Sequence, residues 1–180
     1  MNRKRVTQNQ SLFATMNPEA INPMPSAAKP TASLRYIPVY HVELVRDRSI
    51  KAEPRPSIHN SDDVVAMLQD ELLTADREKL ICLMLNAKNV VIGMDIVSVG
   101  SLTSSVAHPR EIFKSAILKN AASIILSHGH PSGDPTPSRE DIQLTERIRQ
   151  AGEILGIKLL DHIIIGENGT YSFRNTGRLP

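Results

Sequence analysis

Two histidines, a serine and an aspartate lie close together in the sequence with a spacing that could hold a metal ion. His128 and His130 are separated by one residue, and Ser138 and Asp141 follow after a loop rich in proline and glycine. The apolar residues 121–126 predict a buried strand that ends at His128. Since residues i and i+2 of a strand face the same side, both imidazoles can reach one cation.

A helix predicted to begin after this loop supplies a third ligand. Asp141 lies in its first turn, and the loop can fold the carboxylate back toward the imidazoles. Two histidines and one carboxylate leave a fourth coordination position open, which is how catalytic zinc sites are built. The segment therefore predicts a hydrolytic metal site whose ligands are His128, His130 and Asp141.

The pair Ser138 and Asp141 also has an ordinary structural explanation. A serine that follows a proline is a natural N-cap, and an acid three residues later completes a capping box and favours the helix dipole. Taken alone, the pair indicates a helix start more often than a metal ligand. Both interpretations can hold together, because a capped helix fixes the carboxylate where a metal needs it.

The remaining histidines and the single cysteine are expected to be structural or exposed. His41 and His59 fall in a predicted tail and connector, and we expect both on the surface. His108 precedes a proline at a helix start and His162 lies in an apolar strand. Either histidine could line a pocket, but a hydrogen-bonded structural role is favoured. Cys82 is expected to be a small buried hydrophobic residue.

The segments that must position these groups alternate between strand and helix patterns. Pro38 confines the first predicted strand to a sheet edge, and short polar turns join two later pairs of strands as hairpins. This order predicts an α/β domain built on a mixed sheet. The predicted strands are 34–45, 79–85, 90–99, 121–127, 158–165 and 170–173, and the predicted helices have Ser61, Pro109 and Ser138 at their starts.

The length of 180 residues allows one domain with its own core and an extension. Residues 1–57 carry prolines among asparagine, serine and alanine, and predict a flexible N-terminal extension with an edge strand at 34–45. Residues 58–180 are predicted to form the domain that holds the metal site.

Composition argues against several classes of protein. The net charge is +2 and aromatic residues make up 3% with no tryptophan, so neither charge nor stacking surface indicates a nucleic-acid partner. The single cysteine excludes an internal disulfide framework and is typical of a reducing cytosol. No stretch approaches the roughly 20 apolar residues of a membrane helix, and no apolar core of a signal peptide follows the basic start. We therefore expect a cytoplasmic protein without membrane contact.

The spacing of His128, His130, Ser138 and Asp141 is similar to the JAMM signature of the JAB/MPN metallopeptidase superfamily. Over roughly residues 60–175 the sequence resembles the RadC-like branch of that superfamily. The resemblance implies the MPN/JAB1 fold, which is cytidine-deaminase-like, with a mixed β-sheet flanked by helices. The segments that carry the resemblance are 90–92, 100–102, 108–114, 127–133 and 160–166.

Three features depart from the RadC-like pattern. Gly129 stands between the histidines where RadC-like proteins usually have asparagine, and we expect it to point away from the metal. Residues 1–57 show no helix-hairpin-helix DNA-binding region, which full-length members often carry. The acid after the Val-Ile-rich strand is Asp95, which is shorter than usual.

The resemblance also implies a role for each residue of the site. The two histidines and Asp141 would bind Zn²⁺, and a water would fill the open position. Glu78, at the start of strand 79–85, is the candidate general base, and Asp95 is the second candidate. Ser138 would donate a hydrogen bond to the developing oxyanion.

Three functions are compatible with these features. The favoured one is a zinc metallopeptidase or isopeptidase that acts on a peptide or protein substrate. The second is a DNA-associated accessory protein, as the historical repair label of RadC-like proteins suggests, and the third is a non-catalytic MPN scaffold. Scaffold members typically lose the metal ligands, whereas this chain keeps them, and the sequence leaves the oligomeric state open. The basic residues available for weak DNA binding are Arg3, Lys4, Arg5, Lys29 and Arg35.

Overall fold

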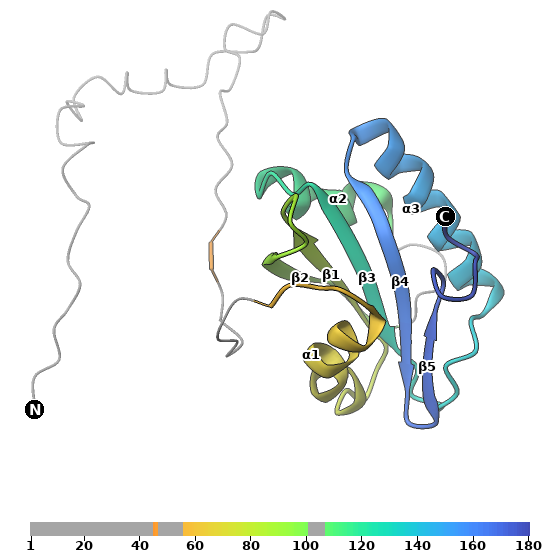
Figure 1. Ribbon diagram of the computed structural model, residues 1–180. Helices are drawn as coiled ribbons and strands as arrows, with labels where there is room; N and C mark the ends of the chain where they lie inside the picture. Colours follow the sequence, from red (N-terminus) through yellow and green to blue (C-terminus); the bar gives the residue numbers. More distant parts are fainter. Residues whose placement is uncertain (1–44, 47–55, 101–106) are drawn as a thin grey trace, which may run out of the picture. The chain divides into compact units, whose positions relative to one another are not determined.

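A computed structural model describes residues 45–46, 56–100 and 107–180 of the chain. Most of the predicted extension lies outside these residues. The part outside includes His41 and all of the predicted edge strand 34–45 except its last residue. Three helices and five strands alternate along the described part of the chain (Figure 1). The helices are Ser61–Leu73 (α1), Pro109–Leu118 (α2) and Arg139–Leu155 (α3), and the strands are Lys79–Leu85 (β1), Val91–Val99 (β2), Ser123–Gly129 (β3), Lys158–Gly166 (β4) and Gly169–Ser172 (β5).

The five strands form one mixed sheet in the order β2-β1-β3-β4-β5. The strand β1 pairs antiparallel with both β2 and β3, and β4 pairs antiparallel with β5. The strands β3 and β4 are parallel, and α3 is the crossover helix between them. The predicted α/β class, the mixed sheet and both hairpins are therefore confirmed.

Helices pack on both faces of the sheet, because β1 and β3 are apolar on both sides. Leu80 of β1 belongs to one core together with Phe113 of α2 and Ile148 of α3. The next residue, Ile81, belongs to a second core with Leu68 of α1. Even-numbered residues of β1 thus face α2 and α3, and odd-numbered residues face α1.

A polar side chain caps the start of α1, one residue earlier than the sequence predicted. Asn60 is the N-cap, and its side-chain oxygen accepts a hydrogen bond from the backbone N–H of Asp63 at 3.0 Å. The Asp63 carboxylate accepts one from the backbone N–H of Asn60 at 3.2 Å, which completes a capping box. Ser61 is therefore the first helical residue rather than the cap.

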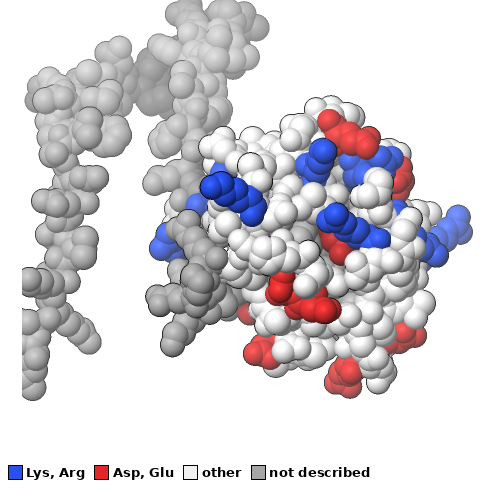
Figure 2. All heavy atoms as spheres, viewed as in Figure 1, with Lys and Arg blue, Asp and Glu red and all other residues white. Residues whose placement is uncertain are grey.

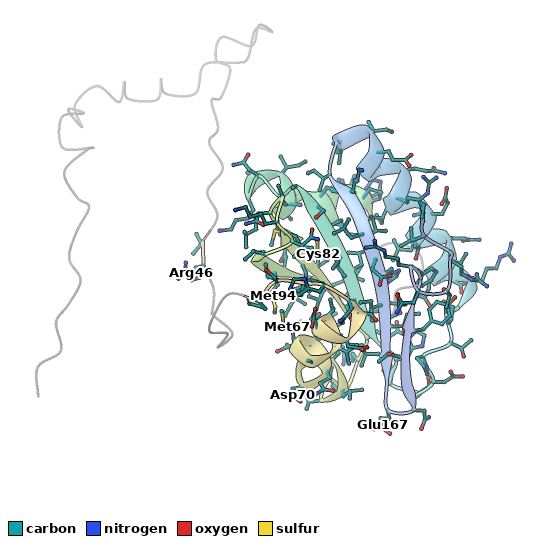
Figure 3. All side chains as sticks on the ribbon, viewed as in Figure 1. Arg46, Met67, Asp70, Cys82, Met94 and Glu167 are labelled. Atoms are coloured by element: carbon teal, nitrogen blue, oxygen red, sulfur yellow. The ribbon has the colours of Figure 1, made fainter. Side chains whose placement is uncertain are left out.

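The single cysteine is buried inside the sheet, as predicted. Cys82 lies on β1 with its side chain in the core shared by α2 and α3 (Figure 3). Desolvation, with a smaller contribution from the charge of Asp95, raises the pKa of its thiol to about 12. In the described part of the chain no helix has the length and apolar character needed to cross a membrane.

Candidate metal centre

Three potential metal ligands meet where β3 ends and α3 begins. The Nε2 atoms of His128 and His130 are 3.0 Å apart. His128 Nε2 lies 3.2 Å from Asp141 Oδ1, and His130 Nε2 lies 3.5 Å from Asp141 Oδ2. Two ligand atoms held at about 2.0–2.1 Å from a tetrahedral zinc ion would be about 3.3 Å apart. The three distances are close to this value, with each imidazole nearest to a different carboxylate oxygen, so the three side chains could hold one metal ion.

The first turn of α3 presents Asp141 to the histidines through a capping box. Ser138 Oγ accepts a hydrogen bond from the backbone N–H of Asp141 at 3.1 Å. The Asp141 carboxylate accepts two in return at Oδ2, one from the backbone N–H of Ser138 at 2.8 Å and one from its hydroxyl at 2.6 Å. The structural interpretation of this pair is confirmed, and the same hydrogen bonds orient the carboxylate toward the imidazoles.

The Asp141 carboxyl is ionised although it is buried. Burial by itself raises its pKa, but the interaction with His128 and the two hydrogen bonds from Ser138 outweigh that effect. The net result is a pKa well below the usual range of an aspartate. Asp141 therefore faces the two imidazoles as an anion.

A chain of hydrogen bonds determines which nitrogen of His128 faces this centre. The hydroxyl of Thr145 donates to the backbone oxygen of Asp141 at 2.6 Å, because a carbonyl can only accept. Thr145 Oγ1 must then accept from His162 Nδ1, which lies 2.6 Å away. His162 Nε2 in turn accepts from His128 Nδ1 at 2.9 Å. In the neutral ring His128 Nε2 is then left without a proton, and its lone pair faces the centre. In the charged ring the same nitrogen donates to the Asp141 carboxylate, which is the interaction that lowers the pKa of Asp141.

The second imidazole is oriented in the same way by the loop. His130 Nδ1 lies 2.7 Å from the backbone oxygen of Asp134, so Nδ1 carries the proton and Nε2 does not. Three acceptor atoms, from His128, His130 and Asp141, therefore face one another with no hydrogen between them when both rings are neutral. Such an arrangement is repulsive unless a proton or a cation lies among the three groups, and a metal cation can take the place of the proton.

His162 and His108 both take the hydrogen-bonded structural role that the sequence favoured. His162 is fully buried and stacks on Phe173 with ring centroids 5.2 Å apart. Desolvation, together with the nearby charge of His128, keeps the pKa of His162 well below its usual range. His108 caps α2 through Nδ1, which accepts from the backbone N–H of Arg110 at 3.2 Å. His162 is thus a support for one ligand rather than a fourth ligand.

Glu78, the first candidate base, lies at the same end of the sheet as the ligands. In the antiparallel pair of β1 and β3, Leu80 lies opposite His128. Glu78 precedes β1 and His130 follows β3, so continuing this register by two residues would set Glu78 opposite His130. Side-chain alternation would then direct Glu78 to the face of the sheet that carries the histidines. Its backbone oxygen accepts from the N–H of Gly100 at 2.8 Å.

Asp95, the second candidate base, is held elsewhere. It pairs with Cys82 in the ladder of β1 and β2, and Cys82 pairs in turn with Leu126, which precedes His128 on β3. The hydroxyl of Ser115 on α2 donates a short hydrogen bond to its carboxylate. The structure therefore joins Asp95 to α2 and does not bring it to the three ligands.

Position 129 lies on the opposite face from the ligands, as expected. A Cβ added at Gly129 would meet the backbone oxygen of Leu72 at 3.0 Å and its Cβ at 3.2 Å. Both atoms belong to α1, on the other side of the sheet. Glycine at this position therefore allows α1 to approach β3 closely and leaves the ligand spacing unchanged.

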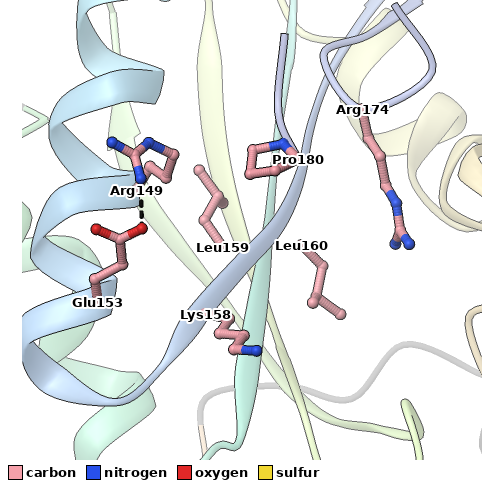
Figure 4. Close-up of a pocket in the computed structure, with 7 residues that line it drawn as sticks. All are labelled: Arg149, Glu153, Lys158, Leu159, Leu160, Arg174 and Pro180. Atoms are coloured by element: carbon pink, nitrogen blue, oxygen red, sulfur yellow. Dashed lines mark hydrogen bonds and ion pairs between the residues drawn. The ribbon is translucent and has the colours of Figure 1, made fainter. Parts of the chain in front are cut away.

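One surface hollow of the described residues lies away from the metal centre. It has a volume of about 440 Å³ and lies between α3 and the first half of β4, where Arg149 and Glu153 face Arg174 across it (Figure 4). Arg149 is already paired with Glu146 and Glu153, so its charge is largely offset. Acidic and basic side chains both occur on the face shown in Figure 2. The lining residues are Arg149, Glu153, Lys158, Leu159, Leu160, Arg174 and Pro180.

Comparison with known proteins identifies the family of the domain. The family model of the RadC-like JAB domain matches residues 58–178. A UPF0758 protein from Desulforamulus reducens is 53% identical over 129 residues, which are 72% of this chain and 57% of the relative. A UPF0758 protein from Moorella thermoacetica is 51% identical over 138 residues, 77% of this chain and 60% of the relative. The matched part thus spans less than two thirds of these relatives, whose names state no activity.

Proposed function

The chain belongs to the family of RadC-like JAB domains, and from that membership we propose that it is a zinc-dependent hydrolase that cleaves peptide or isopeptide bonds. The family and the cluster of two histidines and an aspartate fit a metal-dependent hydrolase. The observation that carries the proposal is the meeting of the Nε2 atoms of His128 and His130 with the two carboxylate oxygens of Asp141, at 3.2 and 3.5 Å.

The donor set suits zinc in particular. Two imidazole nitrogens and one carboxylate oxygen are ligands that zinc prefers, and three protein ligands are typical of its catalytic sites. Each imidazole also donates its other N–H to a fixed acceptor, His162 or the Asp134 carbonyl, as metal-bound histidines do. A zinc ion held there would act as a Lewis acid and lower the pKa of a bound water to about 7.

Glu78 and Ser138 are the proposed catalytic residues beside the ligands. Glu78 precedes β1 at the end of the sheet that carries the histidines, and its carboxylate would accept the proton of the attacking water and return it to the leaving amine. The Ser138 hydroxyl now donates to Asp141 Oδ2 at 2.6 Å, so it must rotate to donate to an oxyanion. One such donor is worth about 3 kcal/mol of transition-state stabilisation.

Elemental analysis of the purified full-length chain tests the metal centre. We expect about one zinc ion per chain in the wild type and none in the double variant His128→Ala/His130→Ala. His59→Ala is the matched control, because His59 is exposed and lies outside the cluster, and it should keep the zinc. A folded wild type that holds no zinc after reconstitution would refute the centre.

A screen for cleavage tests the reaction itself. Zinc-loaded protein would be incubated with peptides and with lysine-linked isopeptides, and the products would be identified by mass spectrometry. Cleavage by the wild type, with none by the double histidine variant, is the expected result. Equal cleavage by both proteins would trace the activity to a contaminant and reject the proposal.

A further inference from the structure

The turn between β4 and β5 holds the loop that orients His130. The backbone N–H of Asn168 in this turn donates to the carbonyl of Gly133 at 3.0 Å. The backbone N–H of His130 donates to the carbonyl of Ile165 at 3.0 Å. Backbone hydrogen bonds at both His130 and Gly133 therefore join the loop to the β4–β5 hairpin.

Gly166 is the point of closest approach between hairpin and loop. A Cβ added there would lie within 3.0 Å of the carbonyl oxygen of Gly133. It would also lie 2.8 Å from the carbonyl carbon of Gly133 and 3.2 Å from the backbone nitrogen of Pro135. Real Cβ atoms essentially never come so close to backbone. Asp134, the residue between Gly133 and Pro135, is the one whose carbonyl accepts from His130 Nδ1 at 2.7 Å.

We propose that Gly166 is a positioning residue of the metal centre, which sets the place of the Asp134 carbonyl and thereby the orientation of the His130 ring. The inference rests on the proposed function, because His130 is a ligand only if the centre binds a metal. His128 and Asp141 belong to β3 and α3, so a shift of the loop would leave both in place. Displacing the loop would therefore misalign one ligand of the three.

The test compares Gly166→Ala with Gly152→Ala, a substitution that also places a Cβ too close to backbone but far from the metal centre. A Cβ added at Gly152 would also lie within 3.0 Å of a backbone oxygen, that of Ile157. Gly152 is near the far end of α3, about 16 Å of helix from Asp141. Both substitutions should lower the melting temperature, but only Gly166→Ala should affect the metal.

Zinc affinity of the full chain, measured by competition with a chromophoric chelator, is the main measurement. We expect Gly166→Ala to bind zinc about 10- to 100-fold more weakly than the wild type, the range found when the support of a metal ligand is lost. Gly152→Ala should match the wild type. Wild-type affinity in a folded Gly166→Ala, or an equal loss in Gly152→Ala, would overturn the inference.

A milder variant decides the question if Gly166→Ala does not fold. Gly133 has a positive φ of 78°. A Cβ added there would lie 3.3 Å from the side-chain nitrogen Nδ2 of Asn168 and 3.4 Å from the Cβ of Glu167. Gly133→Ala should therefore strain the junction between the loop and the β4–β5 turn from the loop side, through its positive φ and with longer contacts than those at Gly166. A smaller loss of zinc affinity is expected, and an unchanged affinity would count against the inference.

A measurement without metal separates this inference from the proposed function. Imidazole nitrogen NMR on the metal-free chain, at a pH where both rings are neutral, reports the tautomer of each histidine. His130 should be protonated at Nδ1 in the wild type and should lose that preference in Gly166→Ala, while His128 stays unchanged. If the wild type binds no zinc but this change occurs, the proposed function fails, and Gly166 still orients the His130 ring without a metal to position. If the wild type binds zinc and neither affinity nor tautomer changes, only the positioning role fails.

Discussion

Single protons determine what the centre can bind. The hydroxyl of Thr145 has one hydrogen, and its donation to the Asp141 carbonyl fixes the tautomer of His162 and then that of His128. A buried and neutral His162 passes this constraint on without taking a charge of its own. The lone pair of His128 Nε2 is therefore set by a side chain that would not touch the metal.

Removing this hydroxyl should weaken metal binding without removing a ligand. In Thr145→Val the Nδ1–H of His162 loses its acceptor, so the tautomers of both histidines are no longer fixed. We expect zinc affinity to fall by about 10-fold or more, as measured by chelator competition. Thr145→Ser keeps the hydroxyl and should retain the affinity of the wild type. Equal affinities in the valine and serine variants would show that the relay does not control the ligand.

Single substitutions also distinguish the two candidate bases, Glu78 and Asp95. Glu78→Gln should keep zinc and lose turnover, because the amide cannot accept a proton. Asp95→Asn should lower stability, since it weakens the hydrogen bond from Ser115, and should keep turnover. Zinc content, melting temperature and cleavage rate would be measured for both. Activity that survives in Glu78→Gln and disappears in Asp95→Asn would reverse the assignment.

At the scale of the elements, the local parts of the site could be predicted from the sequence. A strand that ends in His-x-His and a helix that begins with a serine cap depend on neighbouring residues, and both are found. The structural role favoured for His162 is found, but its contact with His128 could not be predicted, because it depends on the register of β4 beside β3, which shifts between Ile124 and Ile125. The contact of Gly166 with Gly133 likewise joins two turns that are distant in the sequence.

The interior of the sheet makes a prediction about reactivity. The pKa of Cys82 is raised to about 12 by burial in β1, so at pH 8 only about one thiol in ten thousand is ionised. Folded protein should therefore resist a thiol reagent at pH 8 and react fully in denaturant, as followed by absorbance. Because the thiol holds its proton more tightly in the folded state, it contributes to the free energy of unfolding. This contribution is fully present below about pH 8.5, the pKa of a free thiol, and is lost as the pH rises toward 12. Rapid labelling of the native chain would contradict this burial.

At the scale of the whole molecule, the centre lies where several elements meet at one end of the sheet. The end of β3 carries the histidines, the start of α3 carries Asp141, and the start of β1 carries Glu78. Ligand sites in open α/β sheets commonly lie at the ends of parallel strands, and β3 and β4 are the parallel pair here. A metal bound at this end would join β3, α3 and the loop between them, so its binding should stabilise the folded domain.

Metal removal should therefore lower the stability of the whole domain. A ligand that binds only the folded state stabilises it by about 2.7 kcal/mol when its free concentration is 100 times its Kd. We expect the melting temperature of the zinc-loaded chain to fall by several degrees when the metal is stripped with a chelator, and to recover when zinc is restored. The variant His128→Ala/His130→Ala should show no such dependence, which separates binding at the centre from a general effect of the chelator. If wild type and variant respond alike, the stabilising metal is bound elsewhere and the assignment of the three ligands is wrong.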